Sequence, residues 1–420
     1  MGKILSSVIL LVVFTSLAGN AQEKDSLKMK MNGFIRFDYW NDTRVTDEAI
    51  EGIFSLVPSP QVMDNYGNDL NEKSSANALA VSSRVKLAIS GTRVLGAAAS
   101  GLLEADFTGT AGSSRVRLRH AAITLNWTRS SLLMGSYWHQ MVVADAFPSI
   151  ISLSTGAPIQ SFNRSPQVTY TYKINSSLQA TGSAAWESDY TSTGPDGASS
   201  KYLRFSSLPD FTVHLRYSIS NFMIGVLGEA FWIQPRLFTT KPGIPPGLPT
   251  LKKQTNTLLG SYSYQGYMKY SNSRFFVLGK ATVGQNLVHH LMIGGYGTSS
   301  IDPIIGSETY SPFTHLYSFL NVGYGSTIKP SIFIGYARNL GTSEELVGDI
   351  KNVYGRSLNI ASLWRIAPNI SWTIKNLMLA GEVEYTNAEY GNLVFPSKGK
   401  ITDTYHVSNT RFLFIAQYNF

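Results

Sequence analysis

The sequence predicts an all-β fold, a transmembrane antiparallel β-barrel of sixteen strands with an inward-folded third loop; a count of fourteen to eighteen strands fits the same pattern. Three observations lead to this fold class. Apolar and polar residues alternate along long segments, the connections between these segments are alternately short and long, and the chain ends in an aromatic amphipathic strand.

The composition disfavours several other classes of protein. The 420 residues carry 35 Lys+Arg against 27 Asp+Glu, a net charge of +8, yet charged residues make up only 15% of the chain, whereas soluble proteins have about 25%. A soluble enzyme with a charged surface, a disordered chain and a nucleic-acid-binding protein are therefore disfavoured. Because the sequence has no cysteine, disulfides, thiolate metal sites and cysteine nucleophiles are excluded.

Residues 1–21 are predicted to be a secretory signal peptide. Lys3 precedes an apolar run over 8–17, and Gly19-Asn20-Ala21 fits a small-x-small cleavage site. Residues 22–420 then form the barrel domain. They contain no run of the roughly 18 to 20 apolar residues that a spanning helix needs, so the exported chain would enter a membrane only as a closed barrel.

Alternation with period two is clear at the start of the barrel domain. The odd positions from Met29 to Tyr39 are apolar or small, whereas Arg36 and Asp38 lie between them, and the same pattern returns over 258–270 and 377–385. These segments exceed the five or six residues usual for a strand in a soluble sandwich. They are long enough to cross a bilayer as tilted strands.

The connections give the number of strands. Short polar turns are expected at 92–93, 128–131, 175–176, 220–221, 271–273, 327–329 and around 368–369. Long outer connections are expected at 41–79, 142–164, 188–208, 237–254, 290–312, 341–353 and 389–402, with one tight connection near 109–114. These connections join sixteen strands. An even number places both ends of the barrel on the periplasmic side, where outer-membrane barrels have their short turns.

The last strand carries the most specific local signal. Phe412, Phe414, Ala416, Tyr418 and Phe420 share one face of this strand. A terminal aromatic residue on an amphipathic strand resembles the signal that the barrel-assembly machinery recognises, and it also anchors the strand at the membrane interface. We therefore expect outer-membrane lipid and that machinery as partners.

Charged side chains opposite the apolar faces should line an aqueous lumen, because a charge facing lipid costs about 2 to 4 kcal/mol near the membrane midplane. The candidate pore-lining and substrate-binding residues are Arg36, Arg84, Lys86, Glu104, Asp106, Arg115, Arg117, Arg119, Asp145, Arg164 and Arg216. Further lumen-facing charges are expected at Asp38, Glu229, Lys269, Lys280, Arg365, Glu382 and Glu384.

The ladder of Arg115, Arg117 and Arg119 has two interpretations. These arginines could pair with Glu104 and Asp106 on the preceding strand and stiffen the barrel. Alternatively, an excess of cations beside a narrow point would raise the local concentration of anions and select acidic solutes. Both interpretations can hold for different members of the ladder.

The third loop is unusually apolar for a connection between strands. Residues 141–164 include Ala146-Phe147-Pro148, Ile150-Ile151 and Ala157-Pro158-Ile159. An exposed loop of this composition would aggregate, so we expect it to fold into the barrel and narrow the pore. That placement would bring Asp145 and Arg164 to the constriction.

Several stretches of the chain resemble one family in their order and spacing. They are Ser83-Arg84-Val85-Lys86-Leu87, Leu118-Arg119-His120-Ala121, Gly135-Ser136-Tyr137-Trp138, Asp145-Ala146-Phe147-Pro148 and Arg164-Ser165-Pro166-Gln167-Val168-Thr169-Tyr170. Over roughly residues 30 to 175 the chain resembles the DcaP-like porins. The resemblance implies a trimeric, sixteen-stranded porin for dicarboxylates and other small anionic solutes. Family members often carry a helical segment before the barrel, whereas only about six residues separate Gln22 from the first expected strand.

The expected function is passive diffusion of small anionic solutes through an Arg/Lys-lined pore, with no cofactor and no metal. A non-transporting structural or adhesive barrel is the alternative. A hydrolase would need a Ser/His pair in the barrel wall, but the seven histidines are scattered, and the adjacent His289 and His290 would point to opposite faces of a regular strand. That geometry is poor for one metal ion. A TonB-linked receptor would need a plug domain of a hundred-odd residues, and none is expected before the first strand.

Overall fold

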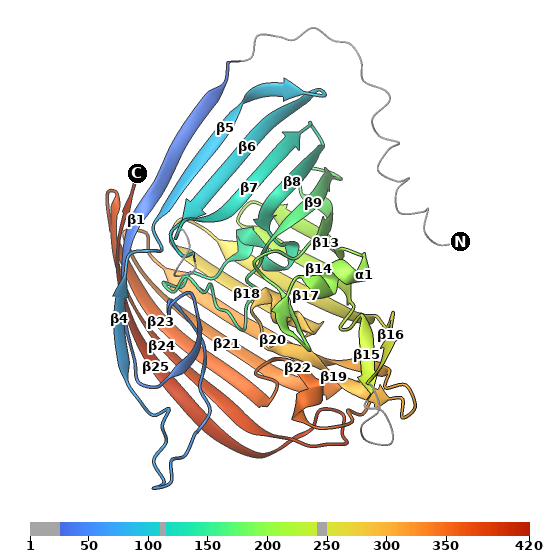
Figure 1. Ribbon diagram of the computed structural model, residues 1–420. Helices are drawn as coiled ribbons and strands as arrows, with labels where there is room; N and C mark the ends of the chain where they lie inside the picture. The colour runs from blue at the N-terminus through green and yellow to red at the C-terminus, as the bar shows by residue number, and fades with distance from the viewer. Residues whose placement is uncertain (1–25, 110–114, 242–249) are drawn as a thin grey trace.

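The computed structural model describes residues 26–109, 115–241 and 250–420, so the expected signal peptide over 1–21 lies outside the described residues. The chain forms a closed antiparallel barrel of sixteen strands. Closure joins the first strand to the last: β1 (Lys28–Asp42) pairs with β25 (Ile401–Asn419), and these strands lie side by side in blue and red in Figure 1. The fold class predicted from the sequence is confirmed.

The remaining wall strands follow in chain order, each paired with its predecessor. They are β5 (Arg84–Val94), β6 (Ala97–Asp106), β7 (Arg117–Asn126), β8 (Ser130–Trp138), β9 (Arg164–Lys173), β10 (Leu178–Ala185), β13 (Asp210–Ile219), β14 (Phe222–Ile233), β17 (Leu259–Ser271), β18 (Phe275–Gln285), β20 (Glu308–Tyr324), β21 (Ile328–Thr342), β23 (Ile360–Ile374) and β24 (Leu377–Leu393). No helix of the described residues is long and apolar enough to cross a membrane.

Shorter elements gather at the end of the barrel that carries the long connections (Figure 1). There β4 (Ser75–Leu79) pairs with β1 beyond the end of β5, and β19 (Gly294–Ile301) pairs with both β20 and β22 (Val353–Arg356). The other elements of the connections are β11 (Ser192–Gly194), β12 (Gly197–Ser199), α1 (Lys201–Ser206), β15 (Phe238–Lys241), β16 (Leu251–Gln254) and the 3-10 helix η4 (Ile350–Asn352).

The burial of the wall strands follows the predicted period of two. In β1 the side chains of Arg36 and Asp38 are buried on the inner face, whereas Ile35 and Phe37 are exposed on the outer face. The same alternation runs through β25, where Phe412, Phe414, Tyr418 and the terminal Phe420 are all exposed. The outer surface is therefore an apolar belt that suits lipid.

Two expected turns are misplaced: residues 92–93 lie inside β5, and the true turn follows at Leu95 and Gly96. Residues 368–369 lie inside β23, and the true turn follows at Lys375 and Asn376. Pro368 keeps its register with Ile332 of β21, but the pairing of β23 with β24 is interrupted between Ile366 and Asn369. Proline lacks a backbone N–H, so a central strand can hold it only where the ladder on one side is broken.

Two segments fold into the barrel and fill part of its interior. The first is the third loop, residues 139–163, which contains the 3-10 helices η1 (Gln140–Val142) and η2 (Ala144–Ala146). Its inward position confirms the prediction made from its apolar composition. The second is a hairpin of β2 (Thr46–Ala49) and β3 (Phe54–Pro58). All five residues of β3 are buried. The sequence pattern predicted only an outer connection over 41–79, so this hairpin was not foreseen.

Candidate pore constriction

The third loop is fastened to the far wall of the barrel by its backbone. The carboxylate of Glu382 on β24 accepts the Ile151 N–H at 2.7 Å and the Ser152 N–H at 3.2 Å. Arg36 on β1, itself paired with Asp38 at 2.7 Å, donates to the Ile151 carbonyl at 2.9 Å. Buried backbone groups need such partners, and here the wall strands supply them.

Strands in two other parts of the barrel wall also hold the third loop. The ammonium group of Lys280 on β18 donates to the Val142 carbonyl at 2.9 Å. On β20 and β21, Asn321 accepts the Ser149 N–H at 2.6 Å and Ser331 donates to the Ser149 carbonyl at 2.8 Å. The loop therefore crosses the lumen and is tied to the wall at separated points along its length.

The β2–β3 hairpin lies against β23, β24 and β25 through buried arginines. Arg365 donates to the carbonyls of Ser55 and Leu56 at 3.0 and 2.9 Å, and also to Ala157 of the third loop at 2.9 Å. Glu384 lies 3.2 Å from the same guanidinium group. One fully buried arginine thus joins the hairpin, the third loop and the wall.

Arg411 on β25 also joins the hairpin to the barrel wall. Its guanidinium group binds both carboxylate oxygens of Asp42, at 2.9 and 2.7 Å, and donates to the Ile53 carbonyl at 3.2 Å. Tyr390 adds a hydrogen bond to the Pro58 carbonyl at 2.8 Å. Two parallel hydrogen bonds to a carboxylate are the geometry that distinguishes arginine from lysine.

The opposite wall, β5 to β7, carries the predicted arginine ladder. Arg119 donates to Glu104 and to Asp106, both at 2.7 Å, and Arg117 pairs with Asp106 at 3.1 Å. Arg119 and Asp106 are 3% and 1% exposed, whereas the Arg117 side chain is 19% exposed. Arg119 therefore braces neighbouring strands, and Arg117 remains in contact with the lumen.

Arg84, Lys86 and Arg115 complete this wall. The Arg84 guanidinium group lies 4.0 Å from Glu104 and stacks over the Phe34 ring. Among the described residues, the ammonium group of Lys86 has no hydrogen-bond or ion-pair partner and is half-buried. Arg115 pairs at 2.9 Å with Glu51, at the tip of the inward hairpin. The cations of this wall thus outnumber the carboxylates that contact them.

The remaining predicted residues lie beside the two ends of the third loop. Asp145 pairs with Arg216 of β13, and its carbonyl accepts a hydrogen bond from Lys269 at 2.7 Å. Arg164 is only 4% exposed; it donates to Tyr190 at 2.7 Å and stacks on the ring of Trp138. The expected place of Arg164 at an open constriction is therefore wrong, because aromatic rings cover its charge.

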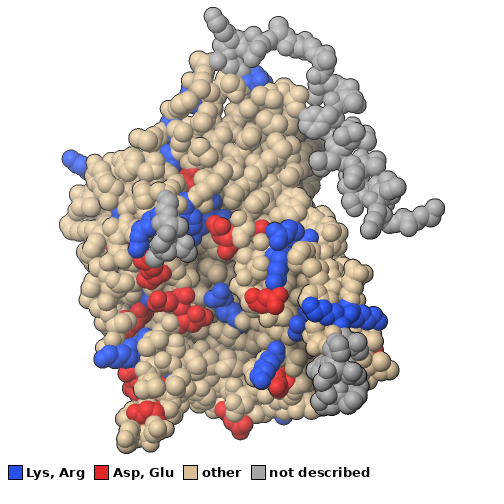
Figure 2. Space-filling model, viewed as in Figure 1, with Lys and Arg blue, Asp and Glu red and all other residues tan. Residues whose placement is uncertain are grey.

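Arg36 and Arg119 are likewise buried beneath the surface of the lumen. Partly exposed members of the predicted set are Arg84, Lys86, Glu104, Arg115, Arg117, Asp145 and Arg216. Figure 2 shows that charged side chains gather over the middle of one face of the molecule, whereas its outer flank is nearly free of charge.

No family model matches the chain, and no curated protein matches its sequence. Solved structures do resemble it. The outer-membrane channel DcaP of Acinetobacter baumannii superimposes with a TM-score of 0.63 at 17% identity, over 96% of this chain and 100% of that chain. The fold is that of the outer-membrane porins. This agrees with the sequence resemblance to DcaP-like porins.

Two further structures share the porin fold. The anion-selective porin of Comamonas acidovorans and the in-vitro folded trimer form of OmpT from Vibrio cholerae both give a TM-score of 0.54 at 9% identity, over 94% of this chain and 100% of theirs. A closed barrel with this fold and an apolar outer belt belongs in the bacterial outer membrane.

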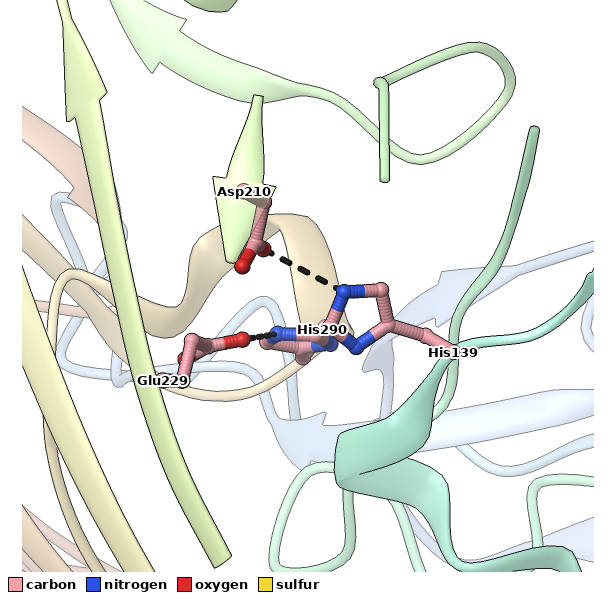
Figure 3. A group of neighbouring side chains, drawn as sticks. All are labelled: His139, Asp210, Glu229 and His290. Carbon is pink, nitrogen blue, oxygen red and sulfur yellow. Dashed lines mark hydrogen bonds and ion pairs between the residues drawn. The ribbon is translucent and has the colours of Figure 1, made fainter. Parts of the chain in front are cut away.

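A polar cluster inside the porin fold was missed in the sequence. His139, Asp210, Glu229 and His290 are all buried and point toward one another (Figure 3). His289 joins them, because both adjacent histidines lie in the 3-10 helix η3 (Leu287–His290) with ring centroids 4.0 Å apart. The expectation of opposite faces assumed a regular strand, and the strand ends at Gln285 instead.

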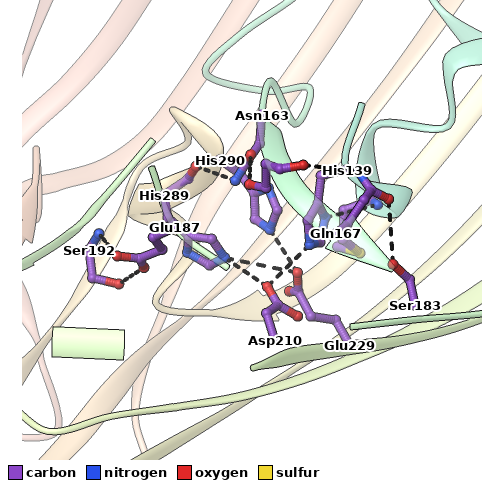
Figure 4. A network of polar contacts seen from close by, with 12 residues as sticks. His139, Asn163, Gln167, Ser183, Glu187, Ser192, Asp210, Glu229, His289 and His290 are labelled. Atoms are coloured by element: carbon purple, nitrogen blue, oxygen red, sulfur yellow. Dashed lines mark hydrogen bonds and ion pairs between the residues drawn. The ribbon is translucent and has the colours of Figure 1, made fainter. Parts of the chain in front are cut away.

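The cluster continues into a wider hydrogen-bond network (Figure 4). Asn163 donates to the His289 carbonyl at 2.8 Å and accepts a hydrogen bond from Ser165 at 2.5 Å. Burial, together with the neighbouring His289 and His139, holds the pKa of His290 well below its usual 6.5. No sequence motif connects these positions, which lie on four separate segments of the chain.

Proposed function

We propose that the protein is an outer-membrane porin through which small anionic solutes, dicarboxylates among them, diffuse passively. The observation that carries the proposal is the surplus of cations on the β5–β7 wall. Lys86 lacks an acidic partner among the described residues, and Arg84 shares Glu104 with the closer Arg119. Across the lumen, the Asp145 carboxylate of the third loop is already paired with Arg216.

The physical reason is that fixed charge in a narrow, low-dielectric passage acts on every ion that crosses it. A cationic wall raises the local concentration of anions and repels cations. A solute with two carboxylates can meet Lys86 and the partly exposed Arg84 or Arg117 together. The guanidinium fork suits a carboxylate, since it donates two parallel hydrogen bonds.

Two likenesses support the proposal. The Comamonas acidovorans structure is an anion-selective porin, and the DcaP structure is an outer-membrane channel. The Vibrio cholerae OmpT structure is a trimer form, and we propose a homotrimer here as well. Phe420 would direct insertion by the barrel-assembly machinery, because it ends the lipid-facing row of β25.

The test is conductance of the purified protein in planar bilayers under a salt gradient. If anions carry most of the current, the reversal potential should have the sign of the chloride equilibrium potential. The anion preference should weaken as ionic strength rises, because salt screens the wall charges. In liposomes, a dicarboxylate of four carbons should enter faster than a neutral sugar of similar size. An anion-selective pore that admits the sugar equally fast would disprove the dicarboxylate preference.

The alternative is a non-transporting structural or adhesive barrel. The inward hairpin and the third loop favour it, because they fill part of the lumen. All five residues of β3 are buried within the barrel. A protein that inserts and stays folded in the bilayer but conducts no ions would establish that these segments occlude the lumen.

A further inference from the structure

The buried histidine and carboxylate cluster joins four separate segments of the barrel. His139 begins the third loop, Asp210 and Glu229 belong to β13 and β14, and His290 ends η3. One nitrogen or oxygen from each of the four residues lies within 4.8 Å of those of the other three. Buried polar groups of this kind need partners, which are either one another or a shared ligand.

The charges of the cluster are poorly balanced by protein groups alone. Among the described residues, Asp210 and Glu229 form ion pairs only with histidines: His139 at 3.3 Å and His290 at 2.7 Å, with His289 at 3.3 and 4.0 Å from the two carboxylates. Two buried carboxylates need compensating positive charge. A bound cation or protonated histidines can supply it; otherwise one of the two carboxyl groups must take up a proton.

Several polar atoms in the cluster lack partners. Asp210 Oδ1, Glu229 Oε2 and His290 Nδ1 are buried without a hydrogen bond among the described residues. The rings of His290 and His139 lie beside each other, with their centroids 4.7 Å apart. Each unpaired buried group costs free energy unless a further ligand satisfies it.

The surroundings suit a small ion rather than an organic ligand. A cavity of about 10 Å³ adjoins the cluster; His139, Asp210 and His289 line it, whereas Glu229 and His290 do not. This volume matches roughly one water molecule. The Phe231 ring packs on His289 at 4.5 Å between centroids and keeps bulk solvent away.

We propose that His139, Asp210, Glu229 and His290 bind one divalent transition-metal ion, for which Zn²⁺ is the best match. Two imidazole nitrogens and two carboxylate oxygens form a ligand set that Zn²⁺ accepts. Metal–ligand bonds of about 2.0 to 2.2 Å place tetrahedral ligands roughly 3.3 to 3.6 Å apart. The two paired contacts of the cluster are 2.7 and 3.3 Å, and all four ligand atoms lie within 4.8 Å of one another, so side-chain rotations would bring them to that spacing.

The ion would have a structural role and no catalytic one. Four protein ligands leave no open position for a substrate, and the ion's two positive charges neutralise the two carboxylates. The bound ion would clip the beginning of the third loop and η3 to β13 and β14, and so fix one side of the constriction.

The first test is metal binding to untagged, chelator-stripped protein in detergent. With Zn²⁺ alone as the probe, equilibrium dialysis should give one tightly bound ion per chain. Co²⁺ should give the intense visible absorption of a tetrahedral site, and Zn²⁺ should bleach it. A folded wild-type barrel that binds no stoichiometric Zn²⁺ would show that the cluster is a proton-sharing network and would overturn the proposal.

The second test assigns the ligands. Glu229→Gln and His290→Gln should each weaken Zn²⁺ binding at least tenfold and abolish the rise in unfolding temperature that Zn²⁺ gives the wild type. His406→Gln, at an exposed histidine of β25, should leave both unchanged. Equal binding by folded cluster variants, or loss of binding in His406→Gln, refutes the assignment. If the cluster variants do not fold, the wild-type stoichiometry and Co²⁺ spectrum decide.

Discussion

Neutralising the two least compensated cations of the β5–β7 wall should reduce anion preference without closing the pore. The double variant Arg84→Gln/Lys86→Gln removes a guanidinium group whose nearest carboxylate, Glu104, is 4.0 Å away, and an ammonium group with no described partner. Both side chains keep part of their surface exposed. Neither of them fastens the third loop or the hairpin through a hydrogen bond.

The magnitude follows from Coulomb's law. A monovalent ion passing about 6 Å from one unit charge in water gains about 0.7 kcal/mol. Screening at 0.1 M salt, with a Debye length of about 10 Å, lowers this to about 0.4 kcal/mol. Removing two charges disfavours chloride and favours potassium by about 0.8 kcal/mol each, so the permeability ratio can change by at most about fifteenfold. Because Glu104 compensates part of the Arg84 charge, we expect a change of about three- to tenfold.

The assay is the reversal potential across a tenfold potassium chloride gradient, measured at low and at high ionic strength. The matched control is Arg274→Gln/Lys375→Gln, which removes the same number of charges from exposed short turns. The control should keep the wild-type ratio. An unchanged ratio in the Arg84→Gln/Lys86→Gln variant at low salt would show that these cations do not set selectivity.

Three further outcomes follow from the contacts of the inward segments and of the last strand. Arg365→Met leaves Glu384 buried without its cation, so it should destabilise the barrel by about 3 to 5 kcal/mol and, by freeing the hairpin, raise single-channel conductance; unaltered conductance in a folded variant would contradict this. Glu382→Ala removes the acceptors of two third-loop N–H groups and should give larger, noisier current steps, whereas Glu382→Gln, which keeps one of the two acceptor oxygens, should give a smaller change. Deleting Phe420 should lower the amount of heat-modifiable barrel in outer membranes several-fold, and normal amounts would argue against its part in assembly.

The barrel was predictable because its wall obeys one rule along the whole chain. Apolar side chains face lipid and polar ones face inward, so the period of two and the connections suffice to count the strands. The wrong turn predicted at Pro368 came from reading a local residue signal without knowledge of strand pairing. Proline and asparagine are both common turn residues, but here the missing N–H of Pro368 falls where β23 and β24 are unpaired.

The interior was less predictable, because long-range contacts decide it. The third loop could be foreseen from its apolar composition, and the β2–β3 hairpin carries a shorter signal of the same kind, Ile53, Phe54, Leu56 and Val57, which was overlooked within 41–79. Its burial depends on Arg365 and Arg411, which lie more than three hundred residues further along the chain. The histidine cluster was missed for a similar reason, since the strand pattern ends at Gln285 and η3 holds both His289 and His290.

The lumen charges separate into two groups that the sequence alone does not distinguish. Arg36, Arg365 and Arg411 are buried and donate hydrogen bonds to backbone carbonyls of the inward segments. Arg84 and Lys86 retain exposed surface and lack such contacts. A guanidinium group covered by protein is screened from a passing ion, yet its loss releases a segment of the constriction. Substitutions in the first group should therefore change the size of the pore, and substitutions in the second group its ion preference.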